Sequence, residues 1–282
     1  MNLSGSEDQP VPIITLLTDF GERDGYVGAM KGVILGIAPH VSLVDISHDI
    51  PPQDIPSAAY VLWSTYRFFP PDTIHLVVVD PGVGTERRPI AVQTRRGRFV
   101  APDNGVLGYV LGQEEEWQAV HLTERRFWRP EISQTFHGRD IFAPTAAHLA
   151  AGVPLHELGP AITDPVAPPF PQVRRLDEAR CQACLIYIDR FGNCVTNLPA
   201  GYPLAGQPAA SWGPALSAQL GDHHIRGLHP TYAAVAPGTP LLLVGSSGFV
   251  EIAVREGNAA ARFGARAGDP VEFRITPSSE HR

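Results

Sequence analysis

Apolar residues in the first part of the chain follow two alternating spacings. Short apolar runs at Ile13–Phe20, Val41–Ser47 and Ile74–Val79 are typical of buried strands. Between them, apolar residues recur three and four positions apart, as in an amphipathic helix, over Val27–Ile37 and Ile55–Tyr66. This strand–helix–strand order predicts a mostly parallel sheet with helices on its faces.

The same alternation continues to about residue 151. Further strands and helices are predicted at Pro89–Gln93, Arg98–Ala101, Gly105–Leu111 and Arg139–Ala151. Residues 160–175 then hold five prolines, which neither a helix nor a central strand tolerates. We therefore predict an N-terminal α/β domain over residues 1–165, followed by a proline-rich linker at about 160–175.

The pattern changes after this linker. Short β-rich runs separated by Gly, Pro and Asn occur at Cys184–Asp189, Pro240–Val244, Phe249–Val254 and Val271–Ile275. They predict a smaller C-terminal domain, a β-rich barrel or sandwich over residues 176–282. The predicted fold class is α/β, with this β-rich domain added to it.

Charge and hydropathy exclude several kinds of partner. The 282 residues include 22 Lys and Arg against 29 Asp and Glu, a net charge of −7, so a nucleic-acid partner is not expected. No apolar segment is long enough to span a membrane, and the N-terminus MNLSGSEDQP is polar and acidic, unlike a secretion signal. We expect no membrane association and a cytoplasmic location.

The cysteines do not suggest a disulfide framework or a metal centre. There are three, Cys181, Cys184 and Cys194, an odd and sparse set that favours a reducing compartment. Cys181 and Cys184 have the spacing of a zinc-binding pair, but a structural zinc site usually draws on a second such pair. We therefore predict buried thiols and no metal.

Polar residues follow the predicted strands where an open parallel sheet binds ligands, beyond the carboxyl ends of its strands. Asp19 closes the first strand, and Asp80 leaves a later one, followed by Gly-rich sequence and Arg87. His137 lies just before a predicted helix. Each also has a simpler interpretation: a turn or helix cap for Asp19, a surface ion pair for Asp80 and Arg87, and a capped helix start for His137.

Seven blocks of sequence resemble the S-adenosyl-L-methionine (SAM) hydroxide adenosyltransferase family. In order, they are LLTDFGERDGYVGAMKGVI, DISHDIPPQDI, VVVDPGVGTERRPI, VAPDNGVL, FHGRDIFAP, YIDRFGNCVTN and GSSGFVEIAVREGNAA. These blocks are distributed along nearly the whole length of the chain. The family is the water-using branch of the fluorinase and chlorinase superfamily. The resemblance implies a SAM hydrolase that cleaves its substrate SAM at ribose C5′, giving adenosine and L-methionine without a cofactor.

The resemblance also implies an assembly and a set of site residues. The assembly is a homotrimer, with SAM between the N-terminal domain of one subunit and the C-terminal domain of its neighbour. The catalytic set falls on Asp80, Arg87 and His137. The substrate-binding positions fall on Asp19, Phe136, Asp189, Phe191, Asn193, Ser246, Asn258 and Ala259.

Two departures from the halogenating relatives bear on the nucleophile. Asp80 stands where the fluorinase has Tyr, and Val83 stands where it has a Thr that helps to hold fluoride. A carboxylate repels a halide but accepts a proton from water, so hydrolysis is the predicted reaction. His137 is expected either to orient the water or to take its proton. A chlorinase-type halogenase and a non-catalytic adenosine- or SAM-binding protein are the alternatives.

Overall fold

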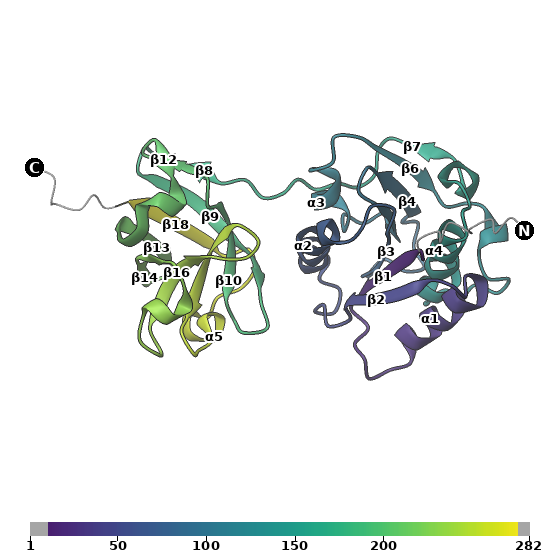
Figure 1. Ribbon diagram of the computed structural model, residues 1–282, viewed down its shortest axis with the longest axis horizontal. Coiled ribbons are helices and arrows are strands. Elements are labelled where there is room, and N and C mark those ends of the chain that lie inside the picture. The colour runs from purple at the N-terminus through teal and green to yellow at the C-terminus, as the bar shows by residue number, and fades with distance from the viewer. Residues whose placement is uncertain (1–10, 276–282) are drawn as a thin grey trace, which may run out of the picture. The chain divides into compact units, whose positions relative to one another are not determined.

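A seven-stranded sheet forms the centre of the first part of the chain (Figure 1). The computed structural model describes residues 11–275, so the N-terminal MNLSGSEDQP lies outside the described residues. The strand order is β2-β1-β3-β5-β4-β6-β7. The strands are β1 (Ile13–Thr18), β2 (Ser42–Ser47), β3 (Ile74–Val78), β4 (Pro89–Thr94), β5 (Arg98–Pro102), β6 (Trp117–His121) and β7 (Ala161–Ile162).

The sheet is mixed: one half pairs in parallel and the other half is added by antiparallel pairing. The strands β2, β1, β3 and β5 pair in parallel, as the strand–helix–strand pattern predicts. The strands β4, β6 and β7 extend the sheet by antiparallel pairing. A short turn joins β4 directly to β5, and a connection of that length permits only antiparallel neighbours. The α/β class is confirmed, and β6 is an additional strand.

Helices cover both faces of this sheet (Figure 1). On one face, α1 (Tyr26–Ile37) packs against α4 (Ala143–Ala150), and Met30 and Ile34 join a core with Ile14 and Leu16. The helix α2 (Ile55–Thr65) packs against α3 (Gly108–Leu111). Short helical turns are η1 (Tyr66–Phe68), η2 (Arg125–Phe127) and η4 (Leu155–Leu158).

The helix predicted at Arg139–Ala151 has an unusual first part. It begins as a π-helix, η3 (Gly138–Phe142), which continues without a break into α4. A π-helical turn bonds residue i to residue i+5, and such turns often occur at functional sites. His137 is the residue immediately before this turn.

The chain divides into two compact units between Phe170 and Pro171. The second unit is built on a nine-stranded sheet of order β14-β13-β18-β9-β10-β17-β16-β15, with β8 paired to β9. Near the two ends of this order, β14 contacts β16, so the sheet curves into a nearly closed barrel. This agrees with the predicted β-rich barrel or sandwich.

The strands of this unit are short. They are β8 (Arg174–Arg175), β9 (Arg180–Ile188), β10 (Cys194–Pro199), β11 (Pro203–Leu204), β12 (Gln207–Pro208), β13 (Leu216–Leu220), β14 (His223–Arg226), β15 (Leu228–His229), β16 (Pro240–Val244), β17 (Phe249–Val254) and β18 (Pro270–Ile275). Helical turns are η5 (Ala209–Ala215), η6 (Tyr232–Ala234) and α5 (Ala259–Phe263).

Candidate active site

Two carboxylates lie at one edge of the first sheet. Asp19 follows β1, and Asp80 follows β3 after one further residue. Because β1 and β3 are parallel neighbours, their carboxyl ends meet at the same edge. A cavity of about 270 Å³ opens there, and both carboxylates line it together with Val83, Phe136 and His137. The structure therefore brings together four of the predicted site residues of this unit.

Arg87 joins Asp80 to His137. Its Nε donates to Asp80 Oδ1 at 2.9 Å, and its Nη2 donates to Asp80 Oδ2. The same Nη2 lies 2.9 Å from His137 Nδ1. The Asp80 and Arg87 side chains are only 5% and 9% exposed, so this is a buried bidentate pair and the surface ion-pair alternative is wrong.

The contact with Arg87 settles the tautomer of His137. A guanidinium has donors and no acceptor, so Nδ1 of His137 must accept the hydrogen bond and cannot carry a hydrogen. Burial lowers the pKa of His137, and the positive charge of Arg87 lowers it further. The imidazole is therefore neutral near pH 7 with its hydrogen on Nε2, and it can donate one hydrogen bond. Its side chain makes no capping hydrogen bond to η3, so the helix-cap alternative is wrong.

The loop that carries Arg87 is held close to the segment that carries His137. Gly84 has φ +77°, and a Cβ added there would lie 2.6 Å from the carbonyl oxygen of Gln134. A side chain at this position would therefore push the two segments apart. Glycine at position 84 allows the close approach that the contact between Arg87 and His137 needs.

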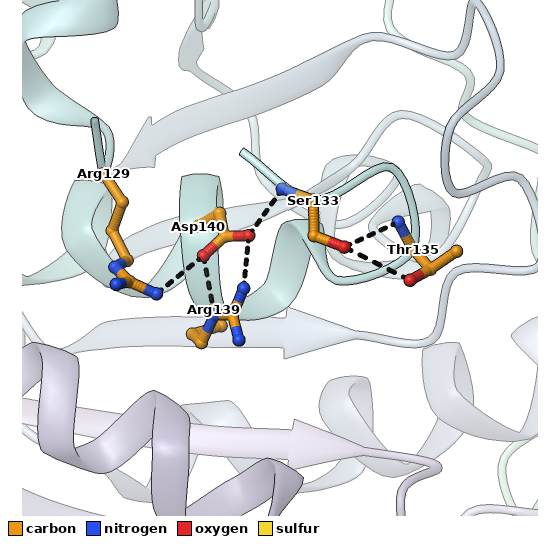
Figure 2. Close-up of polar contacts among 5 residues, drawn as sticks. All are labelled: Arg129, Ser133, Thr135, Arg139 and Asp140. Carbon is orange, nitrogen blue, oxygen red and sulfur yellow. Dashed lines mark hydrogen bonds and ion pairs between the residues drawn. The ribbon is translucent and has the colours of Figure 1, made fainter. Parts of the chain in front are cut away.

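Asp140 holds the segment that carries His137 in place through a second set of hydrogen bonds, as Figure 2 shows. Its carboxylate is fully buried and accepts from Arg139 at 2.7 and 2.8 Å, from Arg129 at 3.1 Å and from the Ser133 backbone N–H at 2.9 Å. Burial alone would raise the pKa of Asp140, but the bonds from Arg139 and Ser133 outweigh it and lower the pKa. Asp140 lies in the block FHGRDIFAP, but it was not predicted to be a site residue.

Asp19 and Phe136 have defined surroundings. Asp19 Oδ2 accepts from the backbone N–H of Gln53 at 2.8 Å, and α1 starts later with Gly25 in the capping position, so Asp19 does not cap that helix. The Phe136 ring packs edge-on against Tyr26 at 5.2 Å, and the Arg139 guanidinium lies over it at 5.0 Å. These contacts orient the aromatic wall of the cavity.

In the second unit, a tight turn between β9 and β10 holds three predicted residues. Asp189 Oδ1 accepts from the backbone N–H groups of Phe191 and Asn193 at 2.9 and 2.8 Å, and Asn193 Nδ2 donates to Asp189 Oδ2 at 2.8 Å. Phe191 is 75% exposed. Gly192 at the apex has φ +83°, and a Cβ there would lie 2.1 Å from Asn258 Cγ. The turn therefore packs on Asn258, which caps the helix that begins at Ala259.

Glu251 is a functional candidate that the sequence interpretation missed. It lies in the middle of β17 and is 8% exposed, and its carboxylate packs on the backbone of Gly245, beside Ser246. Burial raises the pKa of Glu251 to about 7, with a further increase from the charge of Asp189. A charged residue inside the apolar run FVEIAV was the available signal.

In the part of the chain that the structure describes, neither the cysteines nor the other possible metal ligands form a metal site. Burial raises the pKa values of Cys181 and Cys194 to about 12, which makes them inert buried thiols as predicted. Cys184 is only half-buried, so the prediction of a buried thiol is wrong there. Within residues 11–275, no group of three His, Cys, Asp or Glu side chains is arranged to hold a metal ion. Among the helices of residues 11–275, none combines the length and the hydropathy that a membrane span requires.

Comparison with known proteins identifies the family. The profile of the SAM hydroxide adenosyltransferase N-terminal domain matches residues 14–159, and that of the C-terminal domain matches residues 183–272. The chain belongs to this family. Profile and structure together place the buried cluster of Asp80, Arg87 and His137 in the N-terminal domain of the family.

Two hydrolases and a fluorinase are similar to this chain over nearly their full length. The (R)-S-adenosyl-L-methionine hydrolase of Salinispora tropica is 38% identical over 280 residues, covering 95% of this chain and 98% of the relative. The enzyme of the same name from Thermus thermophilus is 35% identical, covering 92% and 98%. A fluorinase from Actinoplanes sp. is 28% identical, covering 91% and 95%.

A solved structure shares the fold. The crystal structure of an uncharacterized conserved protein from Thermotoga maritima matches with a TM-score of 0.86 at 34% identity, covering 93% of this chain and 99% of that one.

Proposed function

We propose that this protein hydrolyses SAM at the ribose C5′ carbon, releasing adenosine and methionine. Membership of the SAM hydroxide adenosyltransferase family supports the reaction, as do the names of relatives at 35% and 38% identity. The observation that carries the proposal is the buried cluster of Asp80, Arg87 and His137, at the edge of a cavity that Asp19 and Phe136 also line.

The proposed mechanism is a single in-line displacement. The sulfonium of SAM has a neutral thioether as its leaving group, so the enzyme needs mainly to align and desolvate a water opposite the C5′–S bond. Asp80 accepts a proton of the water, and Arg87 holds the carboxylate in place.

His137 orients the water in this mechanism. With Nδ1 accepting from Arg87, the neutral imidazole can donate its Nε2 hydrogen to the water oxygen. This leaves a water lone pair free to attack C5′. Of the two roles expected for His137, the hydrogen-bond geometry favours orientation over proton removal.

The other site residues bind the rest of the substrate in this proposal. Asp19 accepts the ribose hydroxyls, and Phe136 packs beside the sugar. Asp189 and Ser246 contact the methionine end of SAM. The remaining contacts come from Phe191, Asn193, Asn258 and Ala259.

A product assay tests the reaction directly. The purified protein is incubated separately with the (R) and (S) sulfonium epimers of SAM, and adenosine and methionine are quantified by liquid chromatography. The names of the relatives lead us to propose the (R) epimer as the preferred substrate. Release of neither product from either epimer, together with tight adenosine binding, would instead support a non-catalytic SAM- or adenosine-binding protein.

Halogenation is the second candidate, because fluorinases are also relatives at 28% identity. In the cavity, the carboxylate of Asp80 and the apolar side chain of Val83 disfavour a halide. The same assay with added chloride separates the two reactions. We expect adenosine as the product with and without chloride, whereas formation of 5′-chloro-5′-deoxyadenosine would assign the protein to the halogenating branch.

We also propose a homotrimeric assembly in the cytoplasm. In this assembly, the N-terminal domain of one subunit and the C-terminal domain of its neighbour share each SAM molecule. The three unpaired cysteines support a reducing compartment. Analytical ultracentrifugation measures the subunit number.

A further inference from the structure

His137 borders a second cavity besides the one lined by Asp19 and Asp80. This second cavity has a volume of about 450 Å³, and Arg87, Arg125 and Ile132 line it together with His137. The three members of the cluster are divided between the two cavities: Asp80 lines the first, Arg87 lines the second, and His137 lines both. The cluster therefore forms part of the wall between them.

The two cavities differ in charge. The first is lined by two carboxylates, Asp19 and Asp80. The second is lined by two guanidiniums, those of Arg87 and Arg125, and none of the described residues around it is acidic. Asp80 and Arg87 neutralise each other as an ion pair, so the remaining charges are those of Asp19 at the first cavity and Arg125 at the second. A cationic sulfonium is therefore attracted to the first cavity and repelled by the second. Water carries no net charge and can enter either cavity.

Water that arrives after SAM has bound needs a separate route to the cluster. A pocket normally buries most of the surface of a small ligand, so a SAM molecule in the first cavity blocks that approach to Asp80. The second cavity reaches His137 and Arg87 from their other side.

We propose that the second cavity is the water-access site of the reaction, through which the nucleophile reaches His137 and Asp80 while substrate fills the first cavity. This inference rests on the proposed hydrolase function. The water oxygen forms the new bond to C5′, and the C5′–S bond breaks with its electron pair remaining on the methionine sulfur. One proton of the water passes to Asp80 and then to solvent.

The proposal predicts where a larger nucleophile would fit. Methanol attacking C5′ through its oxygen would give 5′-O-methyladenosine, with its methyl group pointing back along the route that water uses. Replacing Ile132 by Ala enlarges the second cavity, whereas replacing Thr135 by Ser removes a methyl group at the first cavity and keeps the hydroxyl that bonds to Ser133. Only the first of these changes should make room for the methyl group.

The test compares products in mixtures of water and methanol. The ratio of 5′-O-methyladenosine to adenosine is measured for the wild type, Ile132→Ala and Thr135→Ser. Because both products come from the same active molecules, the ratio does not depend on how much of a variant folds. We expect a several-fold higher ratio in Ile132→Ala and the wild-type ratio in Thr135→Ser.

Other outcomes would overturn the proposal. An unchanged ratio in Ile132→Ala, or an increase in Thr135→Ser alone, would place the nucleophile's route in the first cavity while leaving the hydrolase function intact. A wild type that releases no adenosine from either epimer would overturn both proposals. As a second measurement, Ile132→Trp should lower turnover at saturating substrate several-fold with unchanged adenosine affinity, and undiminished turnover would contradict water access by this route.

Discussion

Arg87 determines what each of its two neighbours can do. Its donors occupy both oxygens of Asp80 and Nδ1 of His137, so the remaining lone pairs of the carboxylate and the Nε2 hydrogen of the imidazole are left for a ligand. An acceptor and a donor at the wall of one cavity match the hydrogen and the oxygen of a water molecule. The contrast between Asp80 and His137 leads to opposite predictions for their amide variants.

Asp80→Asn should abolish most of the turnover. The amide retains the size of the side chain but cannot take a proton, and loss of a general base typically costs about 10²- to 10⁴-fold in rate. Adenosine affinity, measured by calorimetry, should stay near the wild-type value. Wild-type turnover in this variant would remove Asp80 from the mechanism.

His137→Gln should keep most of the turnover, because a glutamine Nε2 can still donate a hydrogen bond to the water. His137→Leu, which cannot donate, is the matched variant and should be much slower. Steady-state rates on the preferred epimer of SAM measure both. If His137 were the proton acceptor, the Gln variant would also lose about 10²- to 10⁴-fold.

Glu251 should make stability depend on pH. Its folded pKa of about 7 lies above the usual 4.5, so its stabilising contribution is complete below about pH 4.5 and is lost as the pH rises through about 7. A difference of one between the folded and unfolded pKa values corresponds to about 1.4 kcal/mol of stability. Urea unfolding between about pH 5 and pH 8 should therefore show a smaller loss of stability in Glu251→Gln than in the wild type.

Glu256→Gln, at an exposed position close in sequence, is the control and should behave like the wild type. The same pH dependence in Glu251→Gln and in the wild type would show that another group is responsible.

Sequence reasoning located residues at strand ends better than residues inside strands. The position of Asp19 and Asp80 beyond apolar runs was sufficient to bring them to one sheet edge, because parallel neighbours share that edge. Glu251 was missed because its burial depends on the strands beside β17 and on the absent side chain of Gly245, neither of which is local in sequence.

At the scale of elements, the segment between Arg129 and Asp140 carries Phe136 and His137 without regular structure until η3 begins. It is fixed by the buried carboxylate of Asp140, which bonds to Arg129 and Ser133 at the start of the segment and to Arg139 at its end (Figure 2). One side chain therefore closes the segment into a loop.

Asp140→Asn should loosen this loop. The amide cannot satisfy two guanidiniums and a backbone N–H at once, and leaving such buried donors unpaired costs about 1–3 kcal/mol. We expect a lower melting temperature, lower turnover and weaker adenosine binding. Glu131→Gln, an exposed change in the same segment, should have little effect. Wild-type turnover and affinity in a destabilised Asp140→Asn would mean that the carboxylate supports the fold alone.

Elements with strong apolar periodicity were predicted closely, and the others were not. The predicted helix at Val27–Ile37 corresponds to α1, and the run at Ile74–Val79 corresponds to β3. The strand β6 was missed because Trp117–His121 mixes polar and apolar residues and is stabilised by pairing with β4. The π-helical turn has no periodic signature that distinguishes it from the α-helix that follows.

At the scale of the whole molecule, the proposed site residues fall in both units. Asp80, Arg87 and His137 belong to the first, whereas Asp189 and Phe191 belong to the second. If each active site uses different units from two subunits, two inactive variants can complement each other. The proposed trimer predicts this result and a site within one subunit does not.

Mixed assemblies of Asp80→Asn and Asp189→Ala test this arrangement. Each variant alone should be nearly inactive, because one lacks the proposed proton acceptor and the other a proposed contact for the substrate. After co-expression, a site between an Asp189→Ala subunit and an Asp80→Asn neighbour can contain both native side chains. Turnover should therefore exceed the average of the separate variants. Activity equal to that average would show that both residues of a site come from one subunit.

The π-helical turn at Gly138–Phe142 holds one residue more than an α-helical turn, because the Ala143 backbone N–H donates to the Gly138 carbonyl five positions earlier. Removing one residue from this turn would shorten that spacing to the four positions of an ordinary α-helix, so His137 before it and α4 after it could keep nearly the same orientation. Removing a residue from within α4 would instead rotate the part before it by about 100° relative to the part after it. The junction between His137 and α4 should therefore tolerate the loss of a residue better than α4 itself.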